Sequence, residues 1–138
     1  MSDSFPRSPY DETDGVVYFP RMCDKIRQHA EGRLAPDYHA NLGRGMDLWT
    51  CQFFGIDYED LAKRVREGAT DAEALAWARE AGIDRPEHDF AWWSAYMRTR
   101  GFRDDLAERL KARKAESGFE NREDIVTFMD YIDADEGR

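Results

Sequence analysis

Cysteine and histidine are scarce in this sequence, which has two cysteines and three histidines among 138 residues. Cys23 and Cys51 form no CxxC pair, so we expect two buried, inert thiols in a reducing compartment. His29, His39 and His88 form neither an HxxxH nor an HExxH motif, which argues against a zinc site. We therefore expect no metal and no cofactor.

Long apolar segments and excess positive charge are also lacking. The longest uncharged, mostly apolar run, LWTCQFFGI at 48–56, is far shorter than the roughly 18 to 20 residues that span a bilayer. Residues 1–15 contain no apolar stretch of the kind found in signal peptides. A net charge of −9 repels nucleic acid and anionic lipid surfaces. We expect a cytoplasmic protein that binds neither nucleic acid nor membranes.

The negative charge is unevenly distributed along the chain. Residues 1–45 hold six basic and seven acidic residues, so almost all of the net charge lies in residues 46–138. An anionic ligand would be repelled least by the first third of the chain.

Strand-like alternation of apolar and polar residues is absent over any useful length, and VVYF at 16–19 is too short and isolated to build a sheet. The sequence predicts an all-α protein, a compact single-domain array of about seven short helices over 17–138. Residues 1–16 contain two prolines and no helical periodicity, which predicts an extended N-terminal arm.

Start and stop signals delimit the predicted helices. They indicate helices over about 20–31 and 45–54, followed by five that begin at Asp57, at Thr70, at Pro86, after Gly101 and at Asn121. Thr70 and Glu73 form a capping box, and Asn121 is the expected cap of the last helix. The acidic end DADEGR at 133–138 is expected to be solvated.

Two helices carry the most informative faces. The fifth has the widest apolar face, made of Phe90, Trp92, Trp93, Tyr96 and Met97. The sixth is expected to bury Phe102, Leu106 and Leu110 and to expose Arg109, Lys111, Arg113 and Lys114. Because adjacent residues on a helix face differently, one of the two neighbouring tryptophans could be exposed, which would hint at a homodimer.

The first helix has a polar face as well as an apolar one. Arg21, Asp24, Lys25 and Gln28 follow one another at helical spacing, and His29 lies at the edge of this face. One interpretation is a solvated face with ion pairs such as Arg21 with Asp24. The other is that Arg21 and Lys25 face the following loop and, with His39, surround an anion.

That loop, APDYHANLGRG at 35–45, is richer in functional groups than a connection requires. The glycines around Arg44 precede a short helix, so their backbone N–H groups could bind a carboxylate or phosphate. The alternative is that they simply permit a tight turn. We expect Tyr38, His39 and Asn41 to fold back on the polar face of the first helix.

No motif in the sequence fixes a reaction. Leu48 stands where a GxGxxG fingerprint needs glycine, and neither a P-loop nor a GxSxG elbow is present. Cys23 and His29 lie too far apart around their helix to form a nucleophile and base pair. His39 could serve as an acid or base, although the sequence alone shows no perturbed pKa.

Several segments resemble those of a known bacterial family, catalogued as domain of unknown function 5069. They are PRSPYDE at 6–12, YFPRMCDKIR at 18–27, DYHANLG at 37–43, FGIDYEDL at 54–61 and DIVTFMDYIDADEG at 124–137. The resemblance implies a small soluble bacterial protein of the expected fold class and carries no activity with it. The matching positions include Arg7, Ser8, Pro9, Pro20, Arg21, Asp24, Lys25, Tyr38, His39 and Asn41.

Two hypotheses about function follow. The first is a non-enzymatic binding or protein-interaction domain. The second is an enzyme or ligand-binding protein for a small anionic metabolite, with a pocket between the first helix and the loop at 35–45. The candidate ligand-binding residues are Arg21, Asp24, Lys25, His29, Tyr38, His39, Asn41 and Arg44.

Overall fold

The structure is a computed structural model that describes residues 5–138. Within this range it contains seven α-helices, one 3-10 helix and one two-stranded sheet. The elements are β1 (Glu12–Thr13), β2 (Val16–Val17), α1 (Phe19–Ala30), the 3-10 helix η1 (Pro36–Asn41), α2 (Met46–Phe54), α3 (Tyr58–Arg66), α4 (Asp71–Ala81), α5 (Glu87–Thr99), α6 (Ala107–Glu116) and α7 (Phe128–Asp135). The predicted all-helical fold class is thus confirmed, with a small sheet added.

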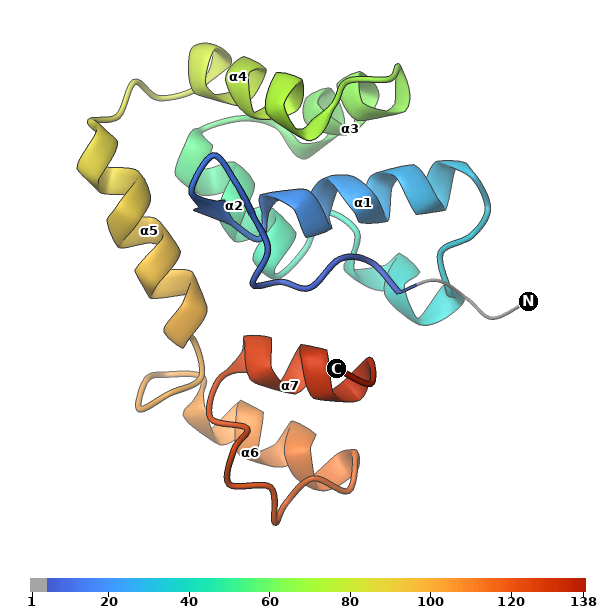
Figure 1. Ribbon diagram of the computed structural model, residues 1–138, viewed down its shortest axis with the longest axis vertical. Coiled ribbons are helices and arrows are strands. Elements are labelled where there is room, and N and C mark those ends of the chain that lie inside the picture. Colours follow the sequence, from blue (N-terminus) through green and yellow to red (C-terminus); the bar gives the residue numbers. More distant parts are fainter. Residues whose placement is uncertain (1–4) are drawn as a thin grey trace.

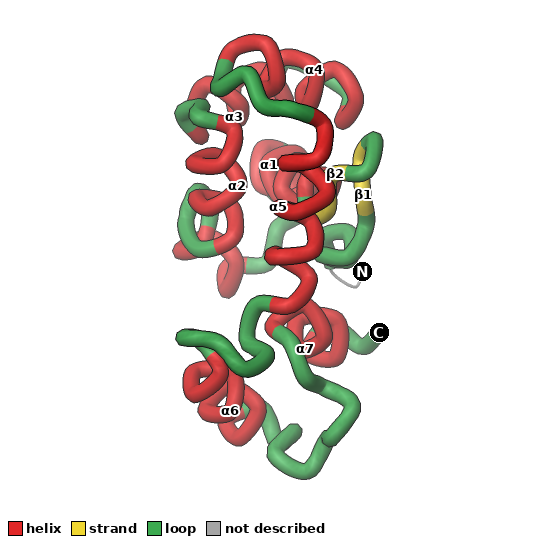
Figure 2. The backbone as a smooth tube through the Cα atoms, turned by 90° about the vertical axis from the view of Figure 1, so that its left-hand side faces the viewer, coloured by secondary structure: helices red, strands yellow, loops and turns green. Residues whose placement is uncertain are grey.

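The helices form two groups joined by α5. Helices α1 to α4 and the β-hairpin form the larger group, and α6 with α7 forms a smaller group at the other end of the molecule (Figure 1). Viewed from the side, α5 runs from the larger group toward α7 (Figure 2). Contacts of α5 with both β2 and α7 fix the smaller group to the larger one.

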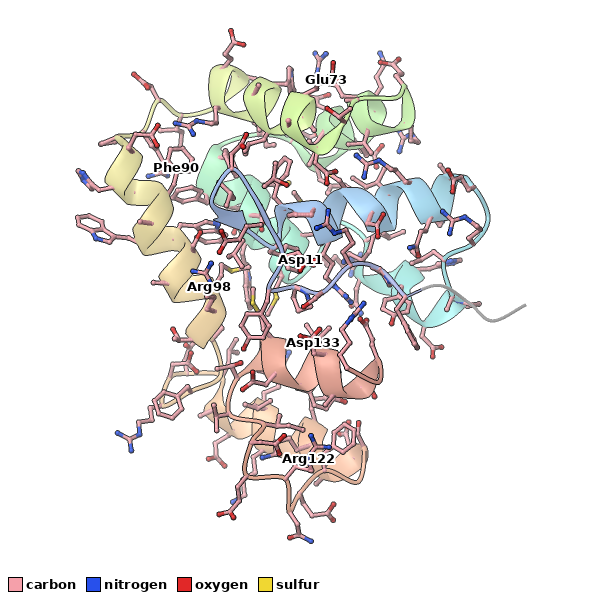
Figure 3. The ribbon with its side chains drawn as sticks, in the orientation of Figure 1. Asp11, Glu73, Phe90, Arg98, Arg122 and Asp133 are labelled. Carbon is pink, nitrogen blue, oxygen red and sulfur yellow. The ribbon has the colours of Figure 1, made fainter. Side chains whose placement is uncertain are left out.

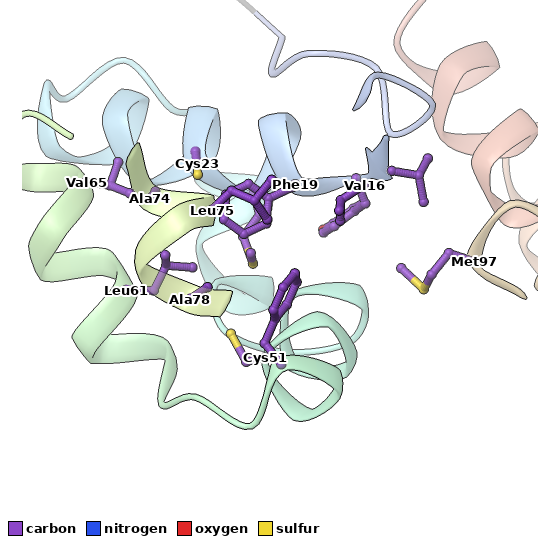
Figure 4. Close-up of a cluster of buried hydrophobic side chains, with 14 of the residues drawn as sticks. Val16, Phe19, Cys23, Cys51, Leu61, Val65, Ala74, Leu75, Ala78 and Met97 are labelled. Carbon is purple, nitrogen blue, oxygen red and sulfur yellow. The ribbon is translucent and has the colours of Figure 1, made fainter. Parts of the chain in front are cut away.

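The main hydrophobic core lies in the larger group (Figure 4). Phe19, Leu61, Leu75 and other apolar side chains from α1, α3 and α4 are almost completely buried there. Both cysteines lie in this core, as predicted, and burial raises the pKa of the Cys51 thiol to about 12. A thiol with so high a pKa is a poor nucleophile near neutral pH.

Several helix boundaries agree with the sequence signals. Pro20 lies in the first turn of α1, where its missing N–H costs nothing. Thr70 and Glu73 form the predicted capping box at the start of α4, with both reciprocal hydrogen bonds present.

Three predictions about the elements are wrong, namely the absence of a sheet and the starts of the last two helices. The sixth helix begins at Ala107 rather than just after Gly101. Val16 and Val17 do form a strand, because β1 lies only a tight turn away and pairs with β2 in antiparallel register. The last helix begins at Phe128 rather than near Asn121, and its cap is Thr127 in a second capping box with Asp130.

The apolar faces of α5 and the segment before α6 also differ from expectation. Phe90, Trp93 and Met97 are buried. Trp92 is 67% exposed, which confirms the expectation that one of the two neighbouring tryptophans is exposed, but Tyr96, which was expected to widen the apolar face, is 49% exposed. They point away from the stripe because its buried side faces β2 and α7. Phe102 is exposed because it precedes α6, in a bend, rather than belonging to its apolar face.

The N-terminal segment is fastened to α7. The Tyr10 hydroxyl donates to Asp130 and lies 2.9 Å from the Thr127 hydroxyl, and the Ser8 hydroxyl donates to Asp133 at 2.9 Å. Figure 3 shows Asp133 on the side of α7 that faces this segment. The expected division into an arm over 1–16 and a domain over 17–138 stays a prediction, although the β-hairpin crosses it.

Candidate functional site

A cleft of about 620 Å³ lies where the two groups of helices meet. Its lining residues come from α1, η1, the loop that leads into α2, α2 itself, α6 and α7. This is the place that the second hypothesis specified, between the first helix and the loop at 35–45, with α6 and α7 as an additional wall. We refer to it below as the cleft.

One inner wall of the cleft is built around a buried ion pair. The guanidinium of Arg21 donates to both carboxylate oxygens of Glu136, at 2.9 and 2.7 Å, and the Tyr38 hydroxyl donates to the same carboxylate at 2.7 Å. Burial alone would raise the pKa of Glu136, but the hydrogen bonds and charge of Arg21, with help from Tyr38 and Arg138, produce a net downward shift. Glu136 is therefore a carboxylate, and α1, η1 and the C-terminal segment converge on it.

A second buried cluster joins α1 to α2. The Asp47 carboxylate, which is fully buried, accepts a hydrogen bond from the Tyr18 hydroxyl at 2.6 Å and pairs with the Lys25 ammonium at 2.9 Å. Lys25 also donates to the Tyr18 oxygen at 3.1 Å. Tyr18 and Lys25 line the cleft, and Asp47 lies behind them. We call these three residues the lysine cluster.

The lysine cluster is an unusual environment for all its members. Burial lowers the pKa of Lys25 by more than the neighbouring Asp47 raises it, so the net shift is downward. Burial, followed by the charge of Asp47, raises the pKa of Tyr18 well above its ordinary value. Tyr18 also has a φ of 73°, in the left-handed region that a bulky side chain seldom occupies. Such backbone strain persists where the surrounding structure enforces it, and it often accompanies function.

The outer edge of the cleft is cationic. Arg44 from the loop and Arg109 and Arg113 from α6 are exposed, and among residues 5–138 their side chains make no ion pair. In all, five cationic and three anionic side chains line the cleft. On a chain with a net charge of −9, this is a local reversal of sign.

Aromatic and aliphatic side chains also line the cleft. They include Tyr38, Trp49, Phe128 and Ile132. A mostly apolar wall with a few fixed polar groups is the usual construction of a small-molecule site.

Five of the eight candidate residues line the cleft, namely Arg21, Lys25, Tyr38, Asn41 and Arg44. The other three, Asp24, His29 and His39, do not. Asp24 accepts the backbone N–H of Arg7 at 3.0 Å. The rings of His29 and His39 pack edge to face, with centroids 4.8 Å apart, and the His39 Nε2 lies 3.0 Å from the Leu34 carbonyl oxygen. The loop does fold back on α1, but its histidine fastens the fold outside the cleft.

The interpretation of the first helix as having a solvated polar face is wrong. Arg21 and Lys25 are each only 4% exposed, and Arg21 pairs with Glu136 rather than with Asp24. The acidic C-terminal end is not fully solvated either, because Glu136 is buried against Arg21. A buried guanidinium requires a buried carboxylate, and the C-terminal segment supplies it.

The glycines before α2 fit the tight-turn interpretation. The backbone N–H of Gly43 donates to the Asp47 carboxylate at 3.0 Å, so one of the chain's own side chains already occupies this position. Gly43 has a φ of 75°, and a Cβ there would lie 2.9 Å from the Tyr58 ring. The turn thus serves to bring Asp47 under α1.

Sequence reasoning did not assign five residues to the cleft or to the buried clusters beside it, namely Tyr18, Asp47, Glu136, Arg109 and Arg113. A signal existed for the two arginines, since they lie three and seven residues after Leu106, which also lines the cleft. No comparable local signal marks Asp47 or Glu136, because their partners lie on other elements of the fold.

Comparison with known proteins supports one assignment. The model of the family described as Domain of unknown function (DUF5069) matches residues 3–138. The chain belongs to this family. A search of curated proteins finds no match. The cleft of this DUF5069 chain must therefore be interpreted through its own geometry and charge.

Proposed function

We propose that the chain binds a small anionic metabolite in the cleft. The observation that carries the proposal is the reversal of charge there, with cationic side chains in excess on a protein that is strongly acidic as a whole. Maintaining such a concentration of positive charge next to a cavity favours an anionic occupant.

The dimensions and the walls of the cleft suit a small molecule. Its volume of about 620 Å³ lies within the range of roughly 300–1,000 Å³ that is typical of ligand pockets. Arg21 and Lys25 are already paired with carboxylates, whereas Arg44, Arg109 and Arg113 keep their donors available to an incoming carboxylate or phosphate. The aromatic wall would then contact the body of the ligand.

Binding measurements with two arginine variants test the proposal. Thermal-shift screening of phosphorylated and carboxylated metabolites, followed by calorimetric titration, should identify anions that bind. Arg109→Gln and Arg113→Gln should each weaken binding about tenfold, which corresponds to about 1.4 kcal/mol and to the loss of one exposed, charge-assisted contact.

The matched control is Lys111→Gln on the same helix, because Lys111 is exposed and does not line the cleft. This variant changes the net charge by the same amount and should leave affinity nearly unchanged. If all three variants lost the same affinity, the effect would come from net charge alone and would contradict a site at Arg109 and Arg113. The absence of any anion binding would also contradict the proposal.

The protein-interaction hypothesis keeps one supporting observation. Trp92 and Tyr96 form an exposed aromatic pair on α5, and the ring of Trp92 packs on His88 with centroids 4.5 Å apart. Large exposed aromatic side chains are common at protein interfaces. A homodimer through this face stays a prediction.

A further inference from the structure

Lys25 differs from every other lysine of the chain. The sequence contains four lysines, and the other three are Lys63, Lys111 and Lys114. Lys63 and Lys111 are exposed and Lys114 is half-buried, whereas Lys25 is 4% exposed and lines the cleft. A buried ammonium is costly, and lysine is the cation whose pKa shifts most readily on burial.

The Lys25 ammonium has a donor to spare. It has three N–H groups and two partners within residues 5–138, the Asp47 carboxylate at 2.9 Å and the Tyr18 hydroxyl at 3.1 Å. Because Lys25 lines the cleft, this third N–H is the one donor of the ammonium left for a ligand there.

The surroundings of Lys25 supply both an acceptor and a donor of protons. Asp47 lies in direct contact with the amine and with the Tyr18 hydroxyl. The carboxylate can therefore take a proton from the nitrogen and return one to the Tyr18 oxygen once the phenol has donated its own proton to a ligand. Tyr18 lines the cleft from a strained left-handed backbone conformation. A purely structural network would explain these bonds, but it would not require the amine and the phenol to border a cavity.

We propose that the anionic ligand of the cleft is an aldehyde or ketone, and that Lys25 forms an imine with its carbonyl carbon. This inference rests on the proposed function, because the cationic edge of the cleft would hold the ligand's carboxylate or phosphate. The downward shift of the Lys25 pKa supports it, since only the neutral amine is a nucleophile.

Imine formation at Lys25 needs no oxidant or reductant. Lys25 transfers one proton to Asp47, its nitrogen attacks the carbonyl carbon, and a C–N bond forms as the carbonyl π bond opens. A second amine proton moves to the ligand oxygen. Tyr18 then protonates the resulting hydroxyl and is reprotonated by Asp47, so the C–O bond breaks and water leaves. The product is a protonated imine, and Asp47 is again a carboxylate.

Borohydride trapping tests directly whether Lys25 forms an imine. The protein is incubated with pyridoxal 5′-phosphate or glyoxylate as anionic aldehyde probes, reduced with borohydride, and digested for peptide mass spectrometry. Lys25 should carry at least about tenfold more adduct than Lys63, although exposure alone would make Lys25 the least reactive lysine.

Three variants separate chemistry from folding. Lys25→Arg keeps a cation beside Asp47 and should abolish the adduct, while Lys63→Arg should leave the Lys25 adduct intact. Tyr18→Phe keeps the amine and should slow adduct formation about tenfold with less effect on binding. Thermal unfolding of each variant confirms that it is folded under the assay conditions.

The aldehyde-free analogue pyridoxine 5′-phosphate distinguishes the two proposals. If it binds in a manner that depends on Arg109 and the aldehydes give no preferential Lys25 adduct, the imine inference is overturned and the anion site stands. If neither the analogue nor the aldehydes bind, both proposals fail. Equal labelling of Lys25 and Lys63 also overturns the imine inference.

Discussion

At the scale of single residues, the most demanding feature of this protein is the burial of ionisable side chains at the cleft. The side chains of Lys25 and Asp47 are almost completely buried. The desolvation penalty of such a pair can exceed the attraction between its charges. Burial of the pair is therefore poor evidence for stability. Its position against a cavity, beside a strained tyrosine, makes binding or chemistry the better explanation.

A double-mutant cycle on this pair gives a residue-scale prediction. Asp47→Asn should destabilise the protein by about 3 kcal/mol, because it leaves the buried ammonium without a counter-charge. Lys25→Met should likewise be costly. The double variant should lose clearly less than the sum of the two, since no unpaired charge is left, as urea unfolding would measure.

The exposed pair Arg66 and Glu59 provides the control for that cycle. Solvent and salt screen this pair, so its coupling should be close to zero. If the buried and the exposed cycles gave equal coupling, the account of the lysine cluster as a desolvated unit would be wrong.

At the scale of elements, predictability depends on whether the deciding contacts are local. The starts of α1 and α4 could be predicted because Pro20 and the pair Thr70 with Glu73 act within one helical turn. The start of α7 could not. Lys114 donates from α6 to the backbone carbonyls of Arg122 and Ile125, which holds the segment after Asn121 out of a helix.

The two capping boxes allow the same substitution, Thr to Ala at the N-cap, to be compared at an exposed and at a buried site. Thr70→Ala should cost about 1 kcal/mol, the usual value for an exposed N-cap. Thr127→Ala should cost more, about 2 kcal/mol, because Thr127 is buried and its hydroxyl also lies 2.9 Å from that of Tyr10. Unfolding in urea measures both, and equal costs would show that the link to Tyr10 adds nothing.

At the scale of the whole molecule, the site depends on contacts that no local pattern encodes. Arg21 and Glu136 are 115 residues apart in the chain, and Tyr38 and Glu136 are 98 apart. The sequence could therefore indicate the cations that α1 and the following loop contribute to the cleft, but not the carboxylates that pair with Arg21 and Lys25, nor the arginines of α6. From the sequence alone, a charged C-terminal end is expected to be solvated. Only the fold shows that Glu136 pairs with the buried Arg21.

The Arg21–Glu136 pair also joins the two groups of helices, which predicts how the whole fold responds to acid. The pKa of Glu136 lies below its ordinary value of 4.5, so its pairing adds stability that is fully present above that value. That stability is lost as the pH falls through the lower pKa of the folded state. Glu136→Gln should destabilise the protein by about 3 kcal/mol at neutral pH.

The same variant should show a shallower loss of stability below pH 4.5 than the unmodified protein, because it has no carboxylate to protonate at this position. Urea unfolding over a series of pH values measures the difference. Glu120→Gln is the matched control, since Glu120 is exposed and makes no ion pair within residues 5–138. Parallel acid profiles for all three proteins would show that the two groups of helices are held together by contacts other than this buried pair.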